Sequence, residues 1–207
     1  LSPMQLRMLH RRSRNGSMTV VGDIAQATGA ALPSGWDEVL EHLPSWKGQK
    51  VAELSVNYRT PTEVMELAGK ILREVAPHLR PPRSVRSTGI PPRFVRVSSD
   101  ELVDNVAQVA RDEIVVGKVA VVAEQSILDA VGERLTAMQV DHSDSMASDV
   151  TLVSLSMVKG LEFDSVVVVE PADVEQTYGL RSLYVALTRA TQHLTIVHSK
   201  ALPSALT

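Results

Sequence analysis

The most constraining feature of this sequence is an uninterrupted run of valines, Val166 to Val169. A strand that is apolar on both of its faces suits a parallel sheet that is covered by helices on both sides. A hairpin strand with one face in water would instead alternate apolar and polar residues. Pro171 follows and ends the strand, because proline cannot donate to a sheet ladder. The run therefore predicts a buried strand of a parallel sheet.

Segments with strand and helix periodicity alternate along the rest of the chain. Short β-branched runs predict strands at 17–21, 51–56, 93–97, 118–123, 150–153 and 193–198. Apolar residues at helical spacing predict helices from Ser2-Pro3 onward, at 36–43, 62–75, 100–114 and 127–138, and around 183–190. The alternation predicts an α/β fold, a mostly parallel sheet with helices on both faces.

The helix around 183–190 carries an arginine near its end. Leu183, Ala186, Leu187 and Ala190 recur at three- and four-residue spacing and predict its buried face. Thr188-Arg189 is therefore expected to lie off that face. An arginine just before a strand, at the rim of a parallel sheet, is poised to reach an anion.

Composition narrows the range of functions. The net charge of −3 gives no basic footprint for nucleic acid, and 3% aromatic residues leave few platforms for stacking bases. The absence of cysteine excludes disulfides and thiol catalysis, and the spacing of the histidines predicts no metal site. No apolar run approaches the ~18 residues of a membrane span, and no signal peptide is recognisable. We therefore expect a soluble, cytoplasmic protein without membrane partners.

Two motifs in the last third of the chain resemble a known family. Lys159-Gly-Leu-Glu-Phe163, followed by Val185-Ala-Leu-Thr-Arg-Ala190, resembles motifs V and VI of superfamily 1 helicases of the UvrD/Rep type. The resemblance implies a RecA-like (P-loop NTPase-like) domain that presents Arg189 to the γ-phosphate of ATP bound on a first such domain. It also implies that Glu162 holds the ribose, and that Gly160 belongs to the same nucleotide-binding motif.

A third match lies near the middle of the chain. Asn57-Tyr58-Arg59, between an expected strand and an expected helix, resembles motif IV of these helicases. The resemblance implies that Tyr58 stacks on the adenine and that Arg59 reaches the γ-phosphate. Arginine offers a planar fork of donors that suits phosphate oxygens. The plainer alternative is a half-buried Tyr58 and an Arg59 that pairs with a surface acid.

The earliest match is Gly22-Asp23-x-x-Gln26, which resembles motif III. The resemblance assigns Gln26 to sensing the γ-phosphate and Asp23 to the nucleotide site. Two departures from the family pattern remove contacts to DNA. Residues 27–32 lack the aromatics that stack on bases, and Ser156 stands where the family usually has a histidine.

The elements that bind nucleotide phosphates are missing from this sequence. Neither Gly69-Lys70 nor Gly117-Lys118 lies in a Gly-x-x-x-x-Gly-Lys-Ser/Thr loop, and the acid pair that holds magnesium is absent before Gly22. We therefore expect ATP with Mg²⁺ to be bound mainly by a first RecA-like domain of the same chain, upstream. Residues 1–48 would be the end of that domain and a linker, residues 49–207 the second domain, and the 207-residue piece alone inactive.

Three functional hypotheses follow. The wording of the motifs is most similar to the HelD branch of superfamily 1, which implies an ATP-driven factor that remodels RNA polymerase. The second hypothesis is a UvrD-type helicase that translocates on DNA. The third is a RecA-like binding module without ATP chemistry.

Overall fold

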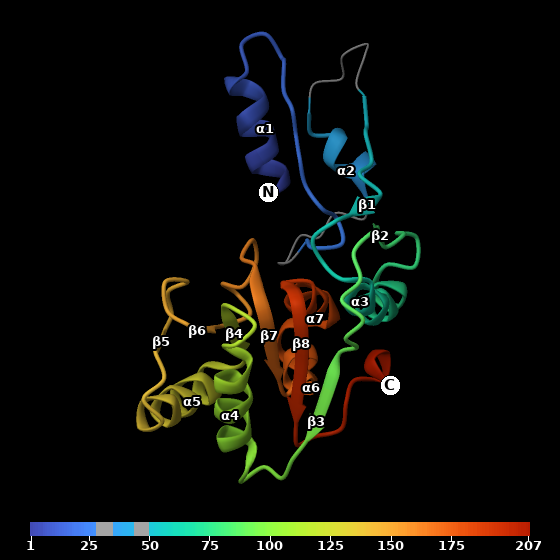
Figure 1. The fold of residues 1–207 in the computed structure, drawn as a ribbon. Coiled ribbons are helices and arrows are strands. Elements are labelled where there is room, and N and C mark those ends of the chain that lie inside the picture. Colours follow the sequence, from blue (N-terminus) through green and yellow to red (C-terminus); the bar gives the residue numbers. More distant parts are fainter. Residues whose placement is uncertain (28–34, 44–49) are drawn as a thin grey trace. The chain divides into compact units, whose positions relative to one another are not determined.

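The computed structural model describes residues 1–27, 35–43 and 50–207, and the chain divides into two compact units, Leu1–Leu54 and Ser55–Thr207 (Figure 1). The division falls after Leu54, whereas the sequence suggested residue 48. The linker expected at 44–48 and most of the segment 27–32 lie outside the described residues. The assignment of each unit to a RecA-like domain of a longer protein stays a prediction.

The first unit begins with α1 (Pro3–Arg12) at the position expected from the sequence. A capping box starts it: the Ser2 hydroxyl accepts the Gln5 N–H at 3.3 Å, and the Gln5 side chain accepts the Ser2 N–H at 2.7 Å. The expected helix at 36–43 is shorter, α2 (Trp36–Leu40).

The strand expected at 17–21 is wrong, because residues 16–23 form no strand. Val21 is 85% exposed. A strand needs a neighbour for its backbone hydrogen bonds, and the described part of this unit offers no strand to pair with.

The second unit is built on a parallel sheet in the order β3-β8-β7-β4-β6-β5 (Figure 1). Its strands are β3 (Arg93–Arg96), β4 (Val119–Val122), β5 (His142–Ser143), β6 (Val150–Val153), β7 (Phe163–Val169) and β8 (Ala190–His198). Every pairing in this sheet is parallel. The α/β fold class predicted from the alternation is therefore confirmed.

A small second sheet pairs β1 (Val56–Asn57) with β2 (Arg83–Ser84), also in parallel. The strand expected at 51–56 is thus largely wrong. Leu54 and Val56 alternate with Glu53 and Ser55 as in a strand, but they are 87% and 56% exposed. Alternation predicts a strand only where a core is present to cover the apolar face.

Helices cover the main sheet on both faces (Figure 1). They are α3 (Thr62–Val75), α4 (Leu102–Glu113), α5 (Gln125–Ala137), α6 (Pro171–Tyr178) and α7 (Leu180–Leu187), followed by a 3-10 turn, η1 (Ser204–Leu206). α4 packs with α5 on one side, and α7 packs with α6 and α3 on the other. α6 was not predicted, because Pro171 was interpreted only as a strand end, although proline also suits the first turn of a helix.

The valine run occupies the position that the sequence predicted. β7 pairs with β4 on one side and β8 on the other, and Val166 to Val169 are at most 1% exposed. Val167 and Val169 pack into the cluster formed with α4 and α5, so alternation turns Val166 and Val168 to the opposite face. Each buried valine contributes about 1.5–3 kcal/mol relative to exposure.

In the described ranges, no helix is both long enough and apolar enough to cross a membrane.

Candidate functional site

Tyr58 and Arg59 lie on a tight turn between β1 and α3. The Asn57 side-chain oxygen accepts the backbone N–H groups of Arg59 at 2.8 Å and Thr60 at 3.1 Å, which fixes the turn. Tyr58 as a whole is 74% exposed, so it is not the half-buried residue of the plainer alternative. An exposed aromatic ring beside an arginine is a suitable surface for a planar base.

Arg59 forms an ion pair with Glu162, at 2.8 Å between Nε and Oε2. Both side chains remain partly accessible, at 48% and 39% exposure. The part of the plainer alternative in which Arg59 pairs with an acid is therefore correct. The acid, however, is itself one of the residues that the motifs singled out, and it belongs to the segment before β7.

The turn after β1 is anchored to the end of α7. Thr60 is 2% exposed, and its hydroxyl donates to the carbonyl oxygen of Thr188 at 3.4 Å. The Ser84 hydroxyl donates to the Thr60 carbonyl at 2.7 Å from the opposite side. The residues next to Arg59 and Arg189 are thus in direct contact. Sequence reasoning missed Thr60 and Ser84, since a single hydroxyl residue carries no recognisable pattern.

Arg189 lies inside the protein, and the expectation that Thr188 and Arg189 lie off the buried face is wrong. Arg189 is 5% exposed. Its Nε donates to the carbonyl oxygen of Val185 at 3.0 Å, Nη1 to that of Leu161 at 3.4 Å, and Nη2 to the Thr188 hydroxyl at 3.2 Å. A buried charge needs such partners, and backbone carbonyls supply them here.

The physical reason is the short connection between α7 and β8. α7 ends at Leu187 and β8 begins at Ala190, opposite Phe163 of β7. The residue before β8 therefore lies against the segment that enters β7. The Phe163 N–H donates to the Arg189 carbonyl at 3.1 Å, so Arg189 holds residues 161 and 163 with its side chain and its backbone.

Gly160 provides the bend that leads into this segment. Its φ is +86°, a region that glycine adopts at little cost, and a Cβ at this position would have no heavy atom within 4 Å. The Leu161 N–H closes the turn onto the Val158 carbonyl at 3.2 Å. Glu162 follows directly and extends toward Arg59.

The structure therefore gathers Arg59, Glu162 and Arg189, together with Gly160, at the amino ends of β7 and β8. Asp23 and Gln26, in contrast, belong to the first unit. The Asp23 carboxylate accepts the Ala25 N–H at 2.9 Å, and a Cβ on Gly22 would lie 3.5 Å from the Trp36 ring. In the first unit Asp23 thus stabilises the turn that follows Gly22.

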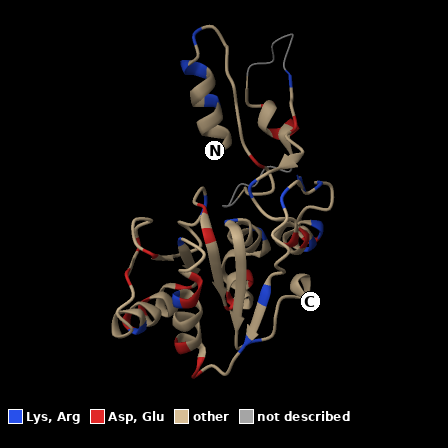
Figure 2. Cartoon of the chain, viewed as in Figure 1, with Lys and Arg blue, Asp and Glu red and all other residues tan. Residues whose placement is uncertain are grey.

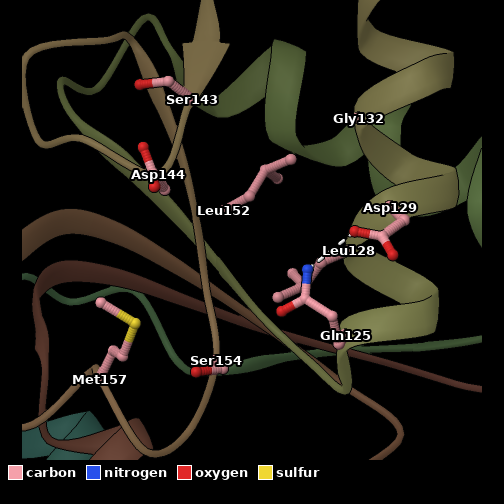
Figure 3. Close-up of a pocket in the computed structure, with 9 residues that line it drawn as sticks. All are labelled: Gln125, Leu128, Asp129, Gly132, Ser143, Asp144, Leu152, Ser154 and Met157. Carbon is pink, nitrogen blue, oxygen red and sulfur yellow. Dashed lines mark hydrogen bonds between the residues drawn. The ribbon is translucent and has the colours of Figure 1, made fainter.

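A hollow of about 440 Å³ lies elsewhere in the second unit, between α5 and the segments after β5 and β6 (Figure 3). Its charged lining residues are the acids Asp129 and Asp144, and Asp129 accepts a hydrogen bond from Gln125 at 2.7 Å. With acids and no lysine or arginine in its lining, this hollow repels phosphate. The guanidinium of Arg59 makes the other site the better one for an anion.

Neither a cluster of like charges nor a metal-binding group indicates a second site in the described residues. Basic and acidic residues are interspersed along the second unit (Figure 2). Across the described ranges, no group of three or more His, Asp or Glu side chains is placed to hold a metal ion.

One family model matches part of this chain. Residues 149–197 match the family model of the UvrD-like helicase C-terminal domain, a segment from the residue before β6 into β8 that includes Gly160, Glu162 and Arg189. No curated protein matches the chain.

A solved structure is similar to most of this chain. It is the C-terminal domain of a possible DNA helicase from Lactobacillus plantarum WCFS1, 22% identical, with a TM-score of 0.56. The similarity covers 73% of this chain and 92% of that one. At this identity the likeness establishes the fold, that of a RecA-like helicase C-terminal domain.

Proposed function

We propose that this chain is the C-terminal part of an ATP-dependent, UvrD-like superfamily 1 helicase, with the second unit as its second RecA-like domain. The observation that carries the proposal is the meeting of the Arg59 turn, the Glu162 segment and the Arg189 junction at one edge of the sheet. These segments are far apart in sequence. Structural contacts alone would also bring these segments together. The accessible guanidinium of Arg59 and the exposed Tyr58, however, favour a site that binds a ligand.

The proposed chemistry is stabilisation of charge on ATP. The nucleotide and Mg²⁺ would be held mainly by a first RecA-like domain, and Tyr58 would stack on the adenine. Arg59 would contact the γ-phosphate, since a guanidinium binds phosphate oxygens with charge-assisted hydrogen bonds. Gln26 and Asp23, which lie in the segment that resembles motif III, would link binding of the phosphate to movement of the two domains.

Arg189 would contact the phosphate only after a change of conformation. Its guanidinium nitrogens are committed to Val185, Leu161 and Thr188. Direct contact with phosphate would require Arg189 to leave these partners when nucleotide binds. In the observed conformation it instead supports the segment that carries Glu162.

The test is ATP turnover by the full-length protein with Arg59→Ala. We expect kcat to fall by ~10³-fold or more, as for the loss of an arginine finger, while ATP binding changes little. Arg93→Ala, on edge strand β3, is the matched control and should retain turnover. Unchanged turnover in Arg59→Ala would contradict the proposal.

Our proposal extends to the polymer or protein partner on which the motor acts. The UvrD-like match and the helicase neighbour favour DNA. The HelD resemblance, which rests on motif wording alone and has no support from the comparisons, favours RNA polymerase. Strand unwinding by the full-length protein would support DNA, co-purification with RNA polymerase without unwinding would support HelD-like remodelling, and no ATP turnover would leave a binding module.

A further inference from the structure

We propose that Glu162 is a positioning residue for Arg59, which turns the guanidinium toward the phosphate. This inference rests on the proposed function. It gives Glu162 a role in addition to the ribose contact that the family resemblance implies.

The first argument is the way in which the two side chains meet. Glu162 takes only the Nε of Arg59, at 2.8 Å. Within the described residues, Glu162 is the only partner of that guanidinium, so both terminal nitrogens stay available for a ligand. Terminal nitrogens are the donors that form paired hydrogen bonds with phosphate oxygens.

The second argument is that Glu162 is itself held from the core. Gly160 bends the chain before it, and Arg189 binds the Leu161 carbonyl and the Phe163 N–H on either side of it. An arginine side chain that is half exposed loses rotamer entropy when it is fixed in one conformation. A rigid carboxylate fixes the guanidinium in the folded protein, before the ligand binds.

The third argument concerns the capacity of the carboxylate. Oε2 accepts the Nε of Arg59, and a carboxylate has a second oxygen with further acceptor positions. The bond to Arg59 can therefore persist while Oε1 accepts a hydroxyl of the nucleotide.

The experiment is a double-variant cycle on ATP turnover by the full-length protein. We expect Glu162→Ala to lower kcat by ~10²-fold with little change in KM, because a misplaced guanidinium weakens only the transition state. Glu162→Ala added to Arg59→Ala should cause no further loss. Glu162→Gln should recover part of kcat, since an amide oxygen can still accept from Nε.

Sugar analogues separate the two roles of Glu162. Glu162→Ala should lower kcat by a similar factor with ATP, 2′-deoxy-ATP and 3′-deoxy-ATP, because the lost positioning of Arg59 does not depend on the sugar. Weaker discrimination among these sugars with kcat retained, or additive losses in the double variant, would overturn the assignment.

A matched control exists on the far side of the unit. Arg134 pairs through its Nε with Asp104 at 2.6 Å, and its side chain is 45% exposed, close to the 48% of Arg59. Asp104→Ala therefore breaks the same kind of contact and should leave kcat unchanged. A full-length protein without any ATP turnover would overturn the proposed function, and this assignment with it. Turnover with additive losses overturns the assignment alone.

Discussion

At the scale of single residues, backbone conformation and hydrogen bonding explain the site better than charge does. Arg189 and Arg59 are both arginines in helicase-like motifs, yet one is buried against carbonyl groups and the other is half exposed. The difference follows from position. Arg189 lies between a helix and a central strand, whereas Arg59 lies on a turn beside a two-stranded sheet at the edge of the unit.

Gly160 gives a prediction at this scale. Gly160→Ala should destabilise the protein by about 1 kcal/mol, because an alanine at φ +86° is strained even where its methyl group meets no neighbour. The free energy of unfolding, measured in denaturant, checks this.

Gly69→Ala is the control that adds the same methyl group. Gly69 lies inside α3, and its new Cβ would come no closer than 3.7 Å to another atom, an ordinary contact. We expect this variant to be more stable by about 0.5–1 kcal/mol, since alanine is the better helix former. Equal effects of the two variants would argue against backbone strain at Gly160.

At the scale of elements, the proline-rich loop 77–92 is attached to the start of α3. The Glu63 carboxylate accepts the Ser87 hydroxyl and the backbone N–H groups of Gly89 at 2.8 Å and Thr88 at 3.4 Å. The hydrogen bond from Ser87, with those from the backbone, lowers the pKa of Glu63 from 4.5 to about 2. The loop therefore depends on the charged form of one acid.

The lowered pKa predicts a loss of stability in acid. The unfolded chain binds a proton at Glu63 near pH 4.5 and the folded protein only near pH 2. The contribution of Glu63 is therefore complete above pH 4.5 and is lost as the pH falls toward 2. Unfolding measured across this window should show a shallower decline in Glu63→Gln than in the unchanged protein.

Glu66→Gln, an exposed position of the same helix, is the control for the removal of a charge. A decline as shallow in Glu66→Gln as in Glu63→Gln would contradict a specific role of the loop contacts. Because Glu63 is partly exposed, salt should reduce the effect.

At the scale of the whole molecule, the second unit would supply only part of the nucleotide site that we propose. It offers an aromatic ring and a guanidinium, and the sequence supplies no phosphate-binding loop. Closure of two lobes around a nucleotide is the usual way in which such half-sites become active.

The 207-residue chain alone should therefore show no ATP hydrolysis above buffer background. Phosphate release, measured at a protein concentration high enough to detect slow turnover, checks this expectation. Release that disappears in Arg59→Ala would contradict the need for a second lobe, since the activity would then belong to this chain.

The sequence alone determined the fold class and most elements of the main sheet. The valine run, the helical spacing in 62–75 and the strand at 150–153 are local patterns, because burial on both faces or on one helical face leaves a direct periodic record. Motif spacing also predicted Arg59, Glu162 and Gly160 as site residues, and their roles stay a prediction.

Tertiary structure alone decided what those residues touch. The burial of Arg189, the Arg59–Glu162 pair and the Thr60–Thr188 contact join segments distant in sequence, and no local pattern specifies which side chain will face which. The same reason explains why the strands expected at 17–21 and 51–56 were wrong. An alternating segment becomes a strand only where folding supplies a neighbour for its backbone and a core for its apolar face.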